Sequence, residues 1–205
     1  MGDTLMAIPL LRNIDTNISP DDKIIVLVKS DLEKSVVQSV KFNCDTDIIC
    51  VPREGQIKKY FSLFKTAIQL RNLQPTILIA PLLFPRIINV LWIRLINAEI
   101  SVGVPGKWNR YGFDRIVNRE PGEHYVEYFV RFGEAAGIDC KIKDIIIPVS
   151  KMMKKNAQSI LPNWTSDQVW IAFAPGSGIK ENFKRWPIAY YKELARLLLN
   201  TSKSF

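Results

Sequence analysis

Hydrophobic residues gather in short runs that alternate with longer stretches of helical periodicity. The runs are rich in Ile and Val and contain few polar residues, as expected of parallel strands that are covered on both faces. They predict strands at Ile24–Lys29, Asp47–Pro52, Thr76–Ala80, Ile100–Val104, Ile145–Val149 and Val169–Ala174. The alternation of strands with helices predicts an α/β fold with a largely parallel sheet.

The stretches between these runs place apolar residues three or four positions apart, which is typical of amphipathic helices. Asp31 suits an N-cap, and Pro187 suits the first turn of a helix. The predicted helices are Asp3–Asn13, Asp31–Val40, Gln56–Asn72, Pro85–Asn97, Glu123–Ala136 and Pro187–Leu199. A polar helix and a Pro-containing loop predict a connector at 151–168, between a domain at 1–150 and residues 169–205.

Both ends of the chain leave their predicted elements incomplete. Gly2 and Asp3 open a helical pattern without the strand that normally leads into such a turn, so we expect the first strand of domain 1–150 to be missing. At the other end, a single strand and helix cannot bury their apolar faces alone. The pattern predicts a chain truncated at both ends.

The composition is that of a globular protein. Of the 205 residues, 47% are hydrophobic and 23% are charged, which excludes long disorder and leaves ample material for a core. The most apolar stretch, Thr76–Ile100, is interrupted by prolines, arginines and asparagines, so we expect buried structure there and no membrane span. Three cysteines without a CxxC pair and a single histidine argue against a metal cage and favour a reducing compartment.

The net charge of +8 is concentrated near the end of the chain, where residues 151–205 hold nine basic and three acidic side chains. Such a bias favours an anionic partner, which could be a nucleotide phosphate, a nucleic acid or an acidic lipid headgroup. Nucleic acid is the least favoured of the three, because no recognised motif and no interleaving of aromatic and basic residues supports it.

Asp3 is the first candidate for chemistry. One interpretation is that Gly2 makes a turn and Asp3 only caps the helix. The other is that Asp3 is a general base, because a carboxylate at the mouth of a parallel sheet can accept a proton from a substrate hydroxyl. The spacing alone leaves both open.

The segment from Ala174 to Pro187 is the second candidate. It follows an apolar strand, contains Gly-Ser-Gly at 176–178, and then supplies Lys180, Lys184 and Arg185 before a helix, which suits a diphosphate. It matches neither the P-loop nor the dinucleotide fingerprint. A flexible turn with solvated lysines remains the alternative.

His124 opens a helical pattern that contains Tyr125, Tyr128, Phe129 and Phe132. A lone histidine at such a place is more often structural than catalytic. The aromatic residues recur at helical spacing, so we expect them in the core and not in a base-stacking platform.

Three stretches, in this order and spacing, resemble glycosyltransferase family 9, the ADP-heptose:lipopolysaccharide heptosyltransferases. The likeness spans nearly the whole chain, and its last stretch is the most specific. The matching residues are Met1-Gly-Asp-Thr-Leu-Met-Ala-Ile-Pro-Leu-Leu11; His124-Tyr-Val-Glu127 with Ala136-Gly-Ile138; and Ala174-Pro-Gly-Ser-Gly178 with Lys184-Arg-Trp-Pro187 and Tyr191-Lys-Glu-Leu-Ala195.

The resemblance implies a GT-B-like fold, in which two Rossmann-like domains face each other across a cleft. Residues 1–150 would form the acceptor-side domain, and residues 169–205 would form the first strand-helix unit of an incomplete nucleotide-sugar-binding domain. By position, Asp3 matches the family's proposed base. Ser177 and Gly178 fall in the loop that faces the donor diphosphate, and Lys184 matches the lysine that contacts it.

The implied reaction is an inverting, metal-independent transfer of a heptose-like sugar from a nucleotide-diphosphate donor such as ADP-heptose. No cofactor is implied. The acceptor would be a lipid-linked saccharide of the lipopolysaccharide-core type, reached at the cytoplasmic face of the inner membrane through peripheral, charge-assisted attachment. After Ile79 the chain reads Ala-Pro-Leu-Leu-Phe-Pro-Arg86, where the family usually has polar residues, so an unusual acceptor is expected.

One further expectation and one alternative accompany this interpretation. Without the rest of the nucleotide pocket, we expect the chain to be unable to turn over as it stands. A protein of another class, a non-catalytic Rossmann-like module that binds an anionic ligand or partner, would fit the same sequence.

Overall fold

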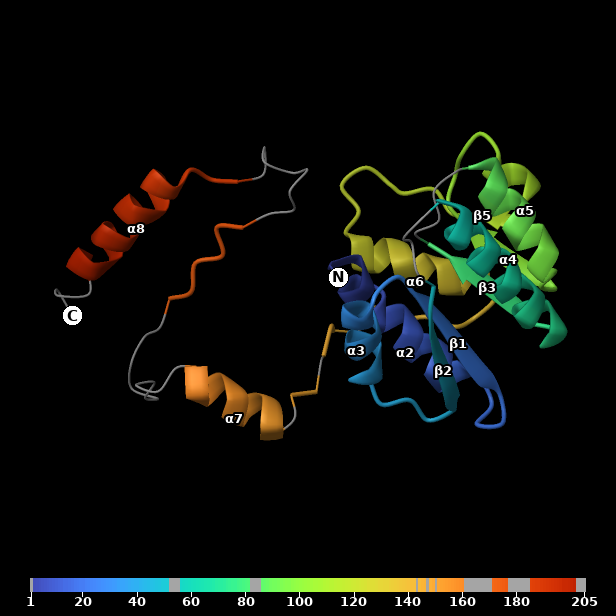
Figure 1. Cartoon of the computed structure of the whole chain (residues 1–205), viewed down its shortest axis with the longest axis horizontal. Helices are drawn as coiled ribbons and strands as arrows, with labels where there is room; N and C mark the ends of the chain where they lie inside the picture. The colour runs from blue at the N-terminus through green and yellow to red at the C-terminus, as the bar shows by residue number, and fades with distance from the viewer. Residues whose placement is uncertain are drawn as a thin grey trace. The chain divides into compact units, whose positions relative to one another are not determined.

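The computed structural model describes residues 2–51, 56–81, 86–142, 144–146, 148–149, 151–160, 171–176 and 185–201, with the backbone alone at 56–60 and 201. The chain divides into two compact units, residues 1–150 and residues 151–205 (Figure 1). The first unit is an α/β structure with parallel strands and carries most of the described elements. The second contains two described helices.

The strands of the first unit form two parallel sheets. In one, β1 (Lys23–Val28) pairs with β2 (Asp45–Cys50), with Lys23 opposite Asp45. In the other, β4 (Ile100–Gly103) lies between β3 (Ile77–Ala80) and β5 (Arg115–Ile116). Both pairings in the second sheet are parallel, which confirms the predicted strand direction.

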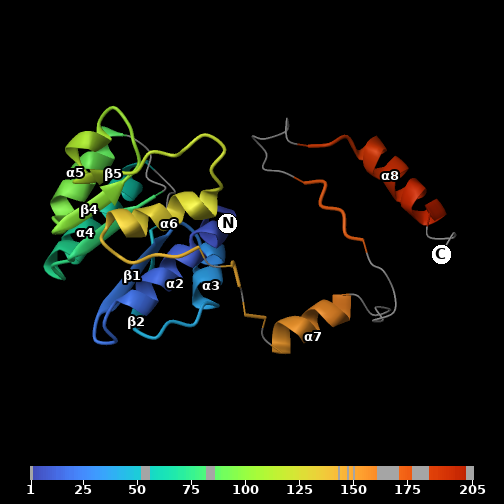
Figure 2. The ribbon, with the colours of Figure 1, turned by 180° about the vertical axis from the view of Figure 1, so that it is seen from behind.

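Helices cover both faces of these sheets (Figures 1 and 2). The alternation along β3 separates the faces: Ile77 and Ile79 pack on the cluster of α2 and α6, whereas Leu78 packs on the cluster of α4 and α5. The helices of this unit are α1 (Gly2–Met6), α2 (Ile8–Asn17), α3 (Asp31–Gln38), α4 (Gln56–Asn72), α5 (Ile87–Ile96) and α6 (Tyr125–Ala135), with a short 3₁₀ helix η1 (Asn109–Tyr111).

The main core lies between the second sheet and α2 and α6. Phe129 and Phe132 of α6 are fully buried there, against Leu10 of α2 and Val102 of β4. A Cβ atom on Gly133 would lie 2.3 Å from the Sγ of Cys140, so the absence of a side chain at 133 sets how closely the segment after α6 packs. Close-packed interiors of this kind carry most of the stability of a domain.

A smaller cluster lies on the opposite face, where Ala67 and Leu70 of α4 meet Ile96 of α5. Ile25 and Leu27 of β1 pack against this cluster, as does Leu78 of β3. The two strands therefore share one pair of covering helices, yet they belong to different sheets and form no ladder with each other.

The predicted first helix, Asp3–Asn13, is two helices in the structure. Pro9 lies in the first turn of α2 and cannot donate a backbone hydrogen bond, so the helical ladder is interrupted at Ala7. The remaining predicted helices of this unit are found, and α4 has the predicted bounds, but the N-cap of α3 is Ser30 and not Asp31.

The predicted strand Ile145–Val149 is wrong for the residues described there, none of which is in a strand. Instead, this segment lies alongside α2. Arg12 donates a hydrogen bond from Nη2 to the carbonyl of Ile146 at 2.8 Å, and Asn13 exchanges hydrogen bonds with the backbone of Lys141. Polar side chains of a helix thus satisfy backbone groups that a sheet edge would otherwise have paired.

In the second unit, α7 (Lys151–Ile160) occupies the first part of the predicted connector, and α8 (Ile188–Thr201) corresponds to the predicted last helix. Within the predicted strand Val169–Ala174, residues 171–174 are described and form no ladder. A strand forms only when it can pair with another strand, and no strand is described in residues 151–205.

Candidate active site

Asp3 lies in the first turn of α1 and is exposed to solvent. The start of α1 is near the starts of α3 and α6, and α1 contacts both helices (Figures 1 and 2). Since α3 directly follows β1, and α6 follows β5 through one loop, these helix starts mark the carboxyl edge of the parallel strands. This edge is where open α/β sheets bind ligands.

The carboxylate of Asp3 has no hydrogen bond or ion pair with another described side chain, so the described structure leaves it accessible to a ligand. Asp3 is not the N-cap of α1, because it lies inside the helix and no hydrogen bond from a described group to its carboxylate caps the helix start. The backbone carbonyl of Asp3 accepts a hydrogen bond from the amide of Ala7 at 3.1 Å, which places the residue within the helix. A negative side chain in a first turn is stabilised by the helix dipole.

His124 caps the start of α6. Its Nδ1 accepts a hydrogen bond from the amide of Val126 at 3.3 Å, while Glu127 accepts one from the amide of His124 at 3.2 Å. These two bonds form a capping box. The geometry accounts for His124 as a structural residue, as its position in the sequence indicated.

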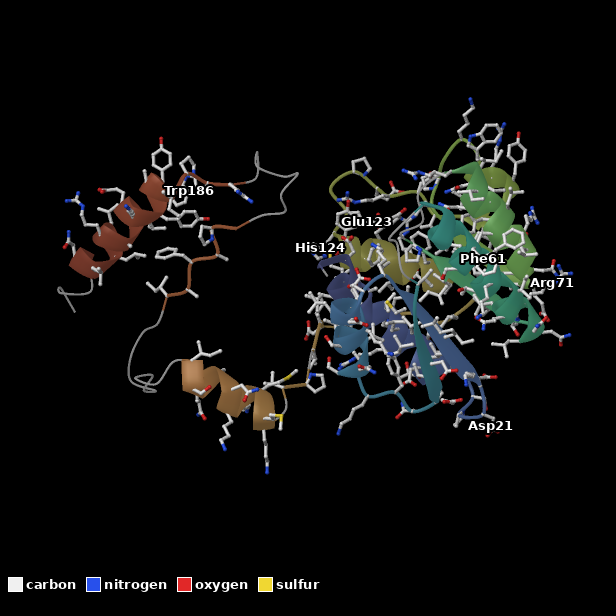
Figure 3. The ribbon with its side chains drawn as sticks, viewed as in Figure 1. Asp21, Phe61, Arg71, Glu123, His124 and Trp186 are labelled. Carbon is white, nitrogen blue, oxygen red and sulfur yellow. The ribbon has the colours of Figure 1, made fainter. Side chains whose placement is uncertain are left out.

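Glu123 precedes this cap and lies among charged groups (Figure 3). Its side chain is 8% exposed and accepts hydrogen bonds from Arg131 at 3.0 Å and from the amide of Glu120 at 2.8 Å. Burial pushes the pKa of Glu123 upward, but the bonds from the Glu120 amide and from the Arg131 guanidinium outweigh it and hold the pKa below its ordinary value. The same pairing raises the pKa of Arg131.

The aromatic residues of α6 follow the core prediction with one exception. Tyr128 is buried with Phe129 and Phe132, and its hydroxyl donates a hydrogen bond to the carbonyl of Val117 at 3.0 Å. Tyr125 is 40% exposed, so the prediction is wrong for this residue. The guanidinium of Arg119 covers its ring at 4.1 Å.

A surface hollow of about 380 Å³ lies over α3 and the start of β2. It is lined by Val37, Phe42 and Ile48 among others, and it does not include Asp3. Within the described residues, no group of three or more His, Cys, Asp or Glu side chains could hold a metal ion. The three cysteines form no disulfide.

The predicted donor-binding residues Ser177, Gly178 and Lys184 lie outside the described residues. The two segments that flank them are described, and both reach Tyr191 of α8. The ring of Phe173 lies 5.7 Å from that of Tyr191, and the ring of Trp186 lies 4.9 Å from it. Trp186 also stacks on Tyr190 at 5.6 Å.

This aromatic cluster holds the two ends of the predicted donor loop near each other. The cluster was not predicted, although two aromatic residues at the start of α8 and one on each side of the loop were a signal for it.

In the described part of the chain, no helix is long and apolar enough to cross a membrane.

Parallel strands with helices on both faces define an α/β fold, and its helix starts gather at the carboxyl edge of the strands. No protein-family model matches the sequence, and no curated protein matches it significantly. Among solved structures, the chain is similar to "the glycosyl transferase family 9 from Veillonella parvula DSM 2008". The TM-score is 0.72 at 20% sequence identity, over 96% of this chain and 56% of that chain.

The fold of this chain is therefore α/β and GT-B-like, with parallel sheets. The chain spans little more than half the length of the similar structure. At this level of identity the likeness establishes the fold, and the chemistry has to be argued from the residues.

Proposed function

We propose that this polypeptide derives from a glycosyltransferase that moves a heptose-like sugar from a nucleotide-diphosphate donor to a saccharide acceptor. The observation that carries the proposal is the fold shared with a glycosyl transferase family 9 protein over 96% of the chain. The position of Asp3 supports it, because the carboxylate is exposed at the ligand-binding edge of the parallel strands.

In the proposed reaction, Asp3 accepts the proton of an acceptor hydroxyl. The hydroxyl oxygen forms a bond to the anomeric carbon of the sugar, and the bond from that carbon to the diphosphate oxygen breaks on the opposite face, so the configuration inverts. The electron pair leaves with the nucleotide diphosphate. Lys184 and the backbone amides at Ser177 and Gly178 would stabilise this developing charge without a metal ion.

The donor is proposed to be ADP-heptose-like and the acceptor a lipid-linked saccharide of the lipopolysaccharide core. Transfer would take place in the cytoplasm, at the inner face of the inner membrane. These assignments rest on the sequence motifs around Asp3, His124 and Lys184. The apolar sequence after Ile79 argues for an acceptor that differs from the usual one.

A chimera tests the proposal. The parts of the Veillonella parvula protein that lie outside its match to this chain would be joined to the chain, and transfer from ADP-heptose would be followed by mass spectrometry. We expect turnover, which Asp3→Asn should lower about a hundredfold or more through loss of the base, with little change in donor affinity. The matched control is Asp21→Asn, which removes an exposed carboxylate from the turn before β1, at the other end of that strand.

Retained turnover in Asp3→Asn would remove Asp3 from the mechanism. Donor binding without turnover in the folded chimera would instead favour the non-catalytic binding module. Lys184→Ala should weaken the binding of ADP itself, which separates the role of the loop from that of the base.

We further propose that the 205-residue chain does not transfer sugar by itself. Its second unit offers two described helices and no described strand from which to build a nucleotide-binding sheet. Sugar transfer from ADP-heptose by the isolated chain would overturn this statement.

A further inference from the structure

The outward side of α4 and α5 is apolar and exposed. On α4, Phe61 is 76% exposed and Phe64 is 52% exposed, with Ile68 one turn further along the helix. On α5, Ile87 and Leu91 are both 56% exposed. The three- and four-residue spacings place these side chains on one side of each helix, which we call the α4–α5 outer face. A contiguous apolar surface of this kind marks an interaction site, whereas single exposed apolar residues are ordinary.

The two helices are fixed to each other. Trp92 of α5 donates a hydrogen bond from Nε1 to the carbonyl of Leu63 in α4 at 2.8 Å. Because both helices pack on the same face of the strands, their outer sides point away from the same core. Figure 3 shows Phe61 and Arg71 toward opposite ends of α4, and both are exposed.

The charge of this region has one sign. Between Glu54 and Glu99 the sequence has no acidic residue and six basic ones. Of these, Lys65, Arg71 and Arg94 are exposed on α4 and α5. Two helices with exposed cations and no acidic residue of their own are complementary to an anionic partner, and the nearest acid that an interaction places beside these cations is Asp114, next to Arg94.

η1 extends the face with residues that suit a membrane interface. Arg94 of α5 donates a hydrogen bond from Nε to the carbonyl of Tyr111 at 2.7 Å, which ties η1 to the helix pair. Lys107 lies over the ring of Trp108 at 5.4 Å, and Arg110 over the ring of Tyr111 at 4.8 Å. Trp and Tyr beside cations are typical of the level of the lipid headgroups.

We propose that the α4–α5 outer face, together with η1, docks onto the surface of a bilayer that contains anionic phospholipids. Phe61, Phe64 and Leu91 would enter the boundary between headgroups and acyl chains, while the cations contact the phosphates. A second copy of the chain is a poor occupant, because it would bring two helices that carry basic and no acidic residues against their own copies. The inference deepens the proposed function, which places the chain at a membrane, by naming the surface that contacts lipid, and its test measures lipid binding without sugar transfer.

Flotation of the full chain with lipid vesicles tests the proposal. We expect the chain to bind vesicles with about 30% phosphatidylglycerol, to bind pure phosphatidylcholine vesicles weakly, and to dissociate as salt screens the charges. The pair Phe61→Ser and Phe64→Ser should reduce bound protein about tenfold or more, and so should Lys65→Glu with Arg71→Glu. A blue shift of the fluorescence on binding should shrink in Trp108→Phe.

Matched controls come from α3 and the segment that follows it. Leu32→Ser removes a side chain that is 58% exposed, and Lys41→Glu reverses one positive charge at another exposed position. Neither should alter vesicle binding. Equal binding to both kinds of vesicle, or equal loss in the control variants, would overturn the proposal.

The last part of the test uses the protein without lipid. Phe61→Ser with Phe64→Ser should leave the Tm and the oligomeric state unchanged, because these side chains have no described cover. A lower Tm, or a dimer that the two substitutions dissociate, would show that this face is covered by protein and would overturn docking on lipid.

Discussion

Two helices on opposite faces of the strands, α6 and α4, use their aromatic residues in opposite ways. Phe129 and Phe132 of α6 are fully buried, whereas Phe61 and Phe64 of α4 are exposed. The start of α6 is also fixed by a capping box and a nearly buried ion pair, while α4 carries basic side chains and no acidic ones. The face of the strands that α6 covers therefore contributes most to stability, whereas the outer side of α4 is exposed and available for binding.

The sharpest test of this contrast is the same substitution on each helix. Phe129→Ala should lower the free energy of unfolding by about 3 to 5 kcal/mol, because it leaves a cavity in the main core. Phe61→Ala should change it by less than about 0.5 kcal/mol, because the side chain is 76% exposed. Urea unfolding monitored by circular dichroism measures both; similar losses would remove the contrast.

The ion pair at the start of α6 should give the second largest effect. Glu123→Gln should cost about 1.5 to 3 kcal/mol at pH 7, because it removes a charged acceptor that bonds Arg131 and the Glu120 amide. Glu134→Gln, at an exposed position of the same helix, is the control and should cost little.

The difference in stability between the original chain and Glu123→Gln should depend on pH, and the sign of this dependence follows from the pKa of Glu123. The pKa of Glu123 is lowered in the folded state, so its contribution is complete above the unfolded pKa of about 4.3 and is lost as the pH falls through the folded pKa. The stabilities of the original chain and Glu123→Gln should therefore converge below about pH 4. A difference that is constant from pH 7 to pH 3 would show that the carboxylate charge does not matter.

Gly133→Ala tests how tightly the α6 side is packed. The new Cβ would meet the Sγ of Cys140 at 2.3 Å and the Cδ1 of Leu10 at 3.0 Å, so a loss of about 1 to 3 kcal/mol is expected. Adding Cys140→Ala to this variant should recover part of the loss in a double-mutant cycle. Gly176→Ala, where a Cβ meets nothing within 4 Å, should be neutral.

The contrast between the helices also shows what sequence could predict. The bounds of α4 follow from uninterrupted periodicity over Gln56–Asn72. Which apolar residues are buried does not follow, because α4 is apolar on more than one side and only the packing partners decide that Ala67 is covered and Phe61 is not. The break before α2 was signalled locally by Pro9, and the prediction of one helix overlooked it.

The hydrophobic pattern of the sequence could not predict elements that depend on pairing between residues far apart in the chain. β5 is two residues long and exists because Arg115 pairs with Val102 and Ile116 with Gly103. The division into two sheets depends likewise on which strands meet, and not on any single strand. For the candidate site, the sequence placed Asp3 at a helix start, as observed, whereas its relation to Ser177, Gly178 and Lys184 stays a prediction.

The smallest expected difference in stability is between substitutions in the exposed cation–π pairs of the two faces. Arg119 covers Tyr125 at 4.1 Å and also donates two hydrogen bonds to the carbonyl of Glu123, so Arg119→Lys should cost about 0.5 to 1 kcal/mol. Arg110 covers Tyr111 at 4.8 Å and donates a hydrogen bond to its hydroxyl alone among described groups, so Arg110→Lys should lie within about 0.5 kcal/mol of the original chain. Thermal unfolding of both variants in one buffer measures the gap, and a larger loss for Arg110→Lys would mean that η1, too, is part of the stabilising structure.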